Sequence, residues 1–167
     1  TTSINGSPLS SLKSIGAEAF SGVMVEINLG TAITELGPNS LAGYAYTGKF
    51  TITSNIKKIH ATPFGKVVYS TSGIQSETSA KISELEFMED VKVVKDYSYE
   101  AIDLINLVKL TATTNILKYF GNNNYCSSSY SYKNFKPTLK EITIFDHTGV
   151  IKKYCKVVGA NLLIFGM

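Results

Sequence analysis

The chain of 167 residues holds two histidines, His60 and His147, and two cysteines, Cys126 and Cys155. Together they contain the donors of a Cys₂His₂ zinc site, but they lack the short paired spacings that such sites use. Asp146 precedes His147, yet adjacent residues rarely orient one another as a base and its carboxylate must. We therefore expect His147 to be a turn residue, His60 a partly buried structural histidine, and neither a catalytic nor a metal site.

The two cysteines, Cys126 and Cys155, leave two alternatives open. In an oxidising compartment they can pair, and the loop-entropy model gives such a disulfide about 3–4 kcal/mol of stabilisation. In a reducing cytosol they stay as two free thiols.

Three acidic residues can share one strand face: Glu84, Glu86 and Asp90. They can hold calcium, but no loop supplies the further oxygen ligands that calcium needs. Cross-strand lysine partners are the simpler interpretation. The motifs Gly-x-Ser-x-Gly, G-x-G-x-x-G and the P-loop are absent, so the sequence predicts no cofactor and a protein that is not an enzyme.

A polar loop rich in serine and asparagine carries three tyrosines, Tyr125, Tyr130 and Tyr132. A tyrosine offers an apolar ring with a polar tip, which suits contact with a sugar or a protein partner. This loop is the candidate binding site, and an ordinary surface loop is the alternative.

Composition excludes several classes of protein. Hydrophobic residues make up 44% and charged residues 17%, which excludes a disordered solvating chain. No apolar run approaches the ~18 residues of a membrane helix, and the first residues lack the charged and apolar parts of a signal peptide. The net charge is +3, all basic residues are lysine, and they are dispersed. We therefore expect no reading of nucleic-acid sequence.

The elements that must position these residues are mostly strands. Alternating apolar residues predict strands within 22–30, 43–53, 66–70 and 81–94, with a bulge or a junction of two strands at Glu89-Asp90. Ser7-Pro8 predicts the start of a helix that ends near Gly22, and a second helix is expected over 101–108. Asp146 and Gly149 bound a hairpin turn, and the apolar run 162–165 predicts a strand buried on both faces.

These patterns predict a β-rich α+β domain: an antiparallel β-sandwich or barrel with one or two helices. Residues 1–13 are expected to form an N-terminal arm, and residues 14–167 a single β-rich domain. We find no internal repeat at a fixed period.

Several stretches resemble bacteriophage tail proteins, especially tail-tube subunits. They are Ile4-Asn-Gly6, Val23-Met-Val-Glu-Ile-Asn-Leu-Gly30, Tyr46-Thr-Gly-Lys-Phe-Thr-Ile-Thr53 and the hairpin from Leu139 to Tyr154. The resemblance covers less than half of the chain and is one of strand-turn-strand pattern. It implies a β-sandwich or barrel whose copies join into rings and whose rings stack into a tube.

The first hypothesis is therefore a non-enzymatic virion subunit that self-assembles into a homo-oligomeric ring, tube or filament. Its partners would be copies of itself and other structural proteins of the assembly. Low charge and many strand-forming residues suit a chain that buries strand edges against its copies. The alternative is a secreted or surface β-sandwich that binds carbohydrate or a protein through its Tyr/Ser/Asn-rich loops.

Overall fold

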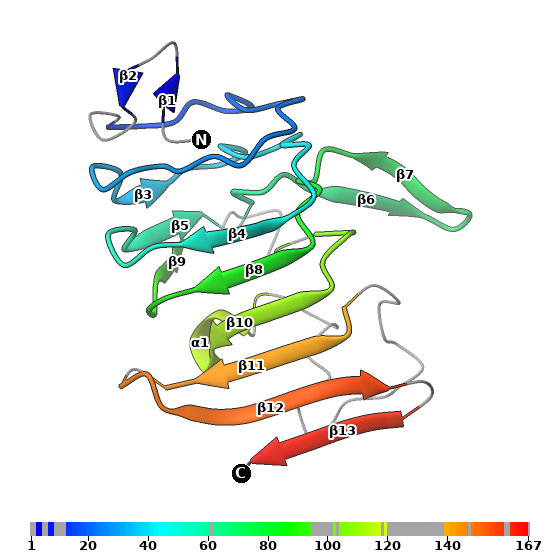
Figure 1. Ribbon diagram of the computed structural model, residues 1–167. Coiled ribbons are helices and arrows are strands. Elements are labelled where there is room, and N and C mark those ends of the chain that lie inside the picture. The colour runs from blue at the N-terminus through cyan, green and yellow to red at the C-terminus, as the bar shows by residue number, and fades with distance from the viewer. Residues whose placement is uncertain are drawn as a thin grey trace.

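The chain winds into a stack of strands that runs from its N-terminal to its C-terminal end (Figure 1). In this computed structural model the described residues are 3–4, 7–8, 13–60, 62–94, 102, 104–117, 119, 139–146, 148–158 and 161–166.

A six-stranded sheet has the order β13-β12-β11-β10-β8-β4. Its strands are β4 (Lys49–Ile52), β8 (Glu84–Phe87), β10 (Lys109–Thr113), β11 (Glu141–Phe145), β12 (Ile151–Val158) and β13 (Asn161–Gly166). The four strands from β4 to β11 are parallel, whereas β12 and β13 are added in antiparallel fashion.

The other elements are shorter. A parallel three-stranded sheet contains β3 (Glu35–Leu36), β5 (Lys58–His60) and β9 (Lys92–Val94). Two antiparallel pairs join β1 (Ser3–Ile4) to β2 (Ser7–Pro8) and β6 (Val67–Ser70) to β7 (Gly73–Glu77). The helix in the described part is α1 (Thr114–Leu117). The β6–β7 hairpin projects from the side of the stack (Figure 1).

Successive coils of the stack repeat one apolar spacing. Ile33, Leu36 and Leu41 in one coil have the same separations as Ile56, Ile59 and Phe64 in the next, and all six are at most 1% exposed. The β3–β5 register sets Leu36 beside Ile59, 23 positions further on. Equivalent residues therefore stack on each other, and each coil is buried by its neighbours.

Backbone hydrogen bonds also join the coils at their turns. Gly22 N donates to Gly43 O at 2.9 Å, and Gly43 N donates to Thr78 O at 2.8 Å. Asn55 adds a side-chain link, because its Nδ2 donates to Ile33 O at 2.7 Å and to Gly30 O at 3.3 Å. These bonds satisfy turn carbonyls that the stacking removes from solvent.

The core face of the six-stranded sheet continues the same stacking. Register places five buried side chains in one row across the strands: Phe50, Leu85, Leu110, Ile142 and Cys155. Burying such side chains contributes roughly 1.5–3 kcal/mol each.

The strand-rich fold class is confirmed, but the antiparallel pairing is wrong for the central strands, which pair in parallel. Parallel neighbours require a long connection between strands, and here each connection is one turn of the coil. The statement that no repeat exists is also wrong. The repeat is hard to see in the sequence because its steps are unequal. The step is 23 positions from Leu36 to Ile59 and 34 positions from Ile59 to Val93.

Several local expectations are corrected as well. No helix lies in the described residues of 7–22, where Ser7–Pro8 is a strand and 17–20 are turns, or in those of 101–108. The segment 22–30 contains no strand, and the nearest pairing is an isolated bridge between Ser21 and Tyr44. The run 162–165 forms part of β13, but its described side chains are exposed. β8 ends at Phe87 and β9 begins at Lys92, so Glu89-Asp90 lies between two strands and the two-strand alternative holds. The division into an arm at 1–13 and a domain at 14–167 stays a prediction.

A buried tyrosine attaches the extended segment 23–30 to the stack. Tyr44 is 0% exposed, its hydroxyl donates to Val25 O at 2.8 Å, and it accepts from Ile27 N at 3.0 Å. Burial raises the pKa of Tyr44 to about 12, so the hydroxyl stays protonated as a donor at neutral pH.

We expect Tyr44→Phe to lower the free energy of unfolding by about 1–2 kcal/mol, because two backbone groups lose their partner. Tyr46→Phe is the matched control, since Tyr46 stacks on Tyr44 with ring centroids 5.8 Å apart and only Tyr44 makes these hydroxyl bonds. Urea unfolding of both variants measures the difference. Equal losses in the two would contradict the anchoring role.

Candidate functional site

The largest sheet of the described structure has six strands, and its side that faces away from the core is here called the outer face. Its side chains come from alternate positions of the strands. They form two rows across the sheet: Lys49, Glu84, Lys109, Glu141, Lys156 and Leu163 in the first, and Thr51, Glu86, Thr111, Thr143, Tyr154 and Phe165 in the second.

The first row alternates in charge. Lys49 Nζ lies 3.9 Å from Glu84 Oε1, Lys109 Nζ lies 3.6 Å from the same oxygen, and Glu141 Oε1 is 4.0 Å from Lys109 Nζ. Glu86 of the second row also pairs with Lys49, at 2.6 Å. The hydrogen bond to Glu86 is the main cause that raises the pKa of Lys49.

These charges neutralise one another at half-exposed positions, where each pair contributes at most about 1 kcal/mol. They favour the observed register, because a slip would separate opposite charges such as Lys109 and Glu141. The predicted lysine partners of Glu84 and Glu86 are thus present. Asp90 lies apart, where its carboxylate accepts from Thr113 Oγ1 at 2.6 Å and Asn115 Nδ2 at 2.9 Å. Within the described residues no three acidic, histidine or cysteine side chains form a metal-binding group.

The second row changes from hydroxyl to aromatic along the stack. Thr111 and Thr143 lie side by side in its middle, half-buried and uncharged. At its end Tyr154 packs on Phe165 with ring centroids 6.0 Å apart, and Tyr154 OH donates to Glu141 Oε1 at 2.9 Å. Partial burial, with that bond, raises the pKa of Tyr154.

The predicted turn between Phe145 and Val150 is confirmed. Asp146 Oδ1 accepts from Thr148 N at 2.8 Å and from Val150 N at 3.1 Å, and Gly149 adopts a φ of 83°. His147 itself lies outside the described residues. Hydrogen bonds led by the Thr148 hydroxyl, with Lys152 3.2 Å away, hold the pKa of Asp146 well below its usual range.

A depressed carboxylate pKa stabilises the fold at every pH above the unfolded value of about 4, and this contribution is lost as pH falls through the lower folded value. We expect the parent protein to unfold at higher urea than Asp146→Asn at neutral pH, with the gap closing only below about pH 4. Urea titrations over this range measure the gap. A gap that stays constant into strong acid would contradict the assignment.

The β6–β7 hairpin is an insertion in one coil. The step from Ile59 to Val93 exceeds the step from Leu36 to Ile59 by 11 positions, which is the length of Val67–Glu77. The chain leaves the stack at Lys66 and returns at Thr78. Thr78 N donates to Lys66 O at 2.9 Å, and Lys66 N donates to Thr78 Oγ1 at 3.2 Å.

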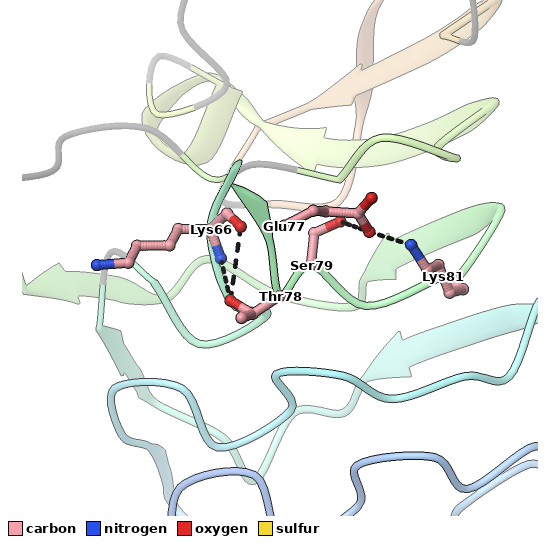
Figure 2. Close-up of polar contacts among 5 residues, drawn as sticks. All are labelled: Lys66, Glu77, Thr78, Ser79 and Lys81. Atoms are coloured by element: carbon pink, nitrogen blue, oxygen red, sulfur yellow. Dashed lines mark hydrogen bonds and ion pairs between the residues drawn. The ribbon is translucent and has the colours of Figure 1, made fainter. Parts of the chain in front are cut away.

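Further polar contacts close the base of the hairpin (Figure 2). Glu77 forms an ion pair with Lys81 and accepts from the hydroxyl of the buried Ser79 at 3.3 Å. Gly65 has a φ of 82°, and a Cβ there would lie 2.1 Å from Thr78 O. These contacts at the base of the hairpin therefore define where the insertion begins and ends.

We expect Gly65→Ala to lower the free energy of unfolding by at least about 2 kcal/mol, from the left-handed backbone and from the clash with Thr78. Gly37→Ala is the control, because nothing lies within 4 Å of its added Cβ and its φ is ordinary. Thermal unfolding followed by circular dichroism compares them. A Gly65→Ala protein as stable as the control would show that the hairpin base is not constrained.

The remaining candidate residues do not converge on a reaction centre. His60 Nε2 lies 2.9 Å from Glu35 Oε1, and Lys58 Nζ is 2.9 Å from Glu35 Oε2, on the three-stranded sheet. These two partners, Lys58 first, lower the pKa of Glu35. The predicted structural role of His60 agrees with this pairing.

Cys155 is fully buried between Ile142 and Ile164 in the sheet. Its predicted partner Cys126 and the loop tyrosines Tyr125, Tyr130 and Tyr132 lie outside the described residues. The disulfide and the tyrosine loop therefore stay predictions.

Two small polar cavities accompany the outer face. One of about 110 Å³ lies between segment 26–29 and β4, and one of about 150 Å³ lies beside Asp90, Asn115 and Asp146. Both carboxylates of the second cavity already accept hydrogen bonds from neighbouring protein groups. No helix in the described part of the chain is long and apolar enough to cross a membrane.

Residues 2–78 match a family model described as "BspA type Leucine rich repeat region (6 copies)". The match covers slightly less than half of the chain and is to a repeat family of bacterial surface proteins. Searches of curated proteins and of solved structures found no match.

This finding corrects the resemblance to phage tail-tube proteins, and with it the hypothesis of a self-assembling virion subunit. The matched region contains both copies of the spacing that begins at Ile33 and Ile56. The strand-turn-strand likeness was misleading because short strands and turns also occur once per coil in a repeat protein. The signal that sequence reasoning missed was the repeated apolar spacing itself.

Proposed function

We propose that this chain is a non-enzymatic, protein-binding repeat domain that acts at a cell surface or outside the cell. Its outer face is the binding surface, and the match of residues 2–78 to a surface repeat family supports the proposal. Repeat proteins present extended surfaces of this kind to their partners.

The observation that carries the proposal is the uninterrupted outer face of six strands. Its middle is uncharged at Thr111 and Thr143 and is bordered by neutralised charge pairs, so a partner can cover it without burying an unpaired charge. Its end is aromatic at Tyr154 and Phe165, a composition enriched at protein interfaces.

The arrangement of ionisable side chains on the outer face favours binding over catalysis. Within the described residues the ionisable side chains of the outer face, apart from Lys156, pair with each other. The tyrosine-rich loop is a second candidate contact region of the same domain.

We expect Thr111→Lys to weaken binding of a protein partner at least about tenfold, because the added side chain rises from the middle of the outer face. Glu86 lies beside Thr111 in the register and can accept the new lysine, so folding is preserved. Thr34→Lys, at an exposed position next to the three-stranded sheet, is the control.

Biolayer interferometry against an array of cell-surface and matrix proteins supplies the measurement. The proposal is overturned if no protein binds, or if every binder tolerates Thr111→Lys as well as it tolerates Thr34→Lys.

A further inference from the structure

The last strand of the six-stranded sheet has an open edge. Among the described residues β13 pairs only with β12. Its sequence from Asn161 to Gly166 carries no charge, and Leu163, Ile164 and Phe165 are 42%, 48% and 56% exposed. A long, uncharged and apolar edge strand is a template for another strand.

Side-chain rows on both faces of the sheet end on this strand. The core row that runs through Ile142 and Cys155 ends at Ile164, and the second outer row ends at Phe165 on Tyr154. An added strand with alternate apolar side chains would continue the core row past Ile164, because alternate side chains of a strand lie on one face of the sheet.

The opposite edge of the sheet is different. Edge strand β4 begins with Lys49, which is paired to Glu84 and Glu86. A lysine on an edge strand opposes the approach of another strand. The two edges thus differ in charge, and only β13 is suited to accept a strand.

The charge around β13 indicates which side chains an added strand would carry. The described residues 139–166 contain four lysines and two acids, Glu141 and Asp146. Both acids already have partners, because Glu141 accepts from Tyr154 and Asp146 pairs with Lys152. Lys156 is exposed beside Leu163 in the register and makes no ion pair within the described part of the chain.

We infer that β13 binds an extended segment of a partner protein, which adds to the sheet as a seventh strand. The segment places apolar residues on the core side, next to Ile164, and polar residues on the outer side, where a carboxylate reaches Lys156 across Leu163. Main-chain hydrogen bonds supply affinity, while the side chains that meet Phe165 and Lys156 supply specificity. This inference rests on the proposed protein-binding function and locates one contact of that function.

The test is a selection of random peptides displayed on phage against the immobilised domain, followed by affinity measurements with the enriched peptides. Enriched sequences should alternate apolar residues and contain Asp or Glu. Phe165→Glu should weaken the affinity of these peptides at least about tenfold, and added salt should weaken it further. Met88→Glu replaces another exposed apolar residue, distant from β13, and should leave affinity unchanged.

A second variant, Lys156→Glu, separates recognition from folding, because it changes only an exposed charge on β12, next to the edge strand. It should weaken the binding of acidic peptides and strengthen the binding of peptides with lysine in place of the acid. If Thr111→Lys weakens peptide binding while Phe165→Glu and Lys156→Glu do not, the β13 site is overturned and the proposed function is kept. Dimerisation of the domain through β13 would overturn the site as well.

Discussion

The structure depends on the stacking of equivalent apolar side chains from one coil onto the next. A coil as short as the step from Leu36 to Ile59 cannot bury its own apolar residues, so each is buried by the coils before and after it. The turn hydrogen bonds from Gly22 to Gly43 and on to Thr78 also link one coil to the next. Stability in such a stack is shared between neighbours rather than centred in one core.

Stacking leaves three parts of the molecule free for other roles. The outer face of the sheet is not needed for burial, so its side chains vary from charge pairs to threonines to the aromatic pair of Tyr154 and Phe165. The side of a coil can accept an insertion, as the β6–β7 hairpin shows, provided that Lys66 and Thr78 close its base. The last strand can accept a further strand at its edge. We attribute binding to these parts and stability to the interior.

Local chemistry was predictable where a few adjacent residues decide the structure. The turn at Asp146 and Gly149 followed from one carboxylate and one permissive backbone position, and the pairing of Glu84 and Glu86 with lysines followed from alternation in a strand. Parallel pairing was not predictable in this way, because Leu85 and Leu110 are brought together by a whole turn of chain. The repeat escaped notice because an insertion of Val67–Glu77 stretched one coil. The apparent helix start at Ser7-Pro8 failed because local propensity yielded to strand pairing.

Hydrogen–deuterium exchange of the domain with and without a bound protein partner tests the central claim most directly, because it reports which strands a partner covers. The account predicts slower exchange in peptides from β8, β10, β11, β12 and β13, with little change in β3, β5 and β9. Protection confined to the three-stranded sheet, or no change in any strand of the outer face, would contradict it.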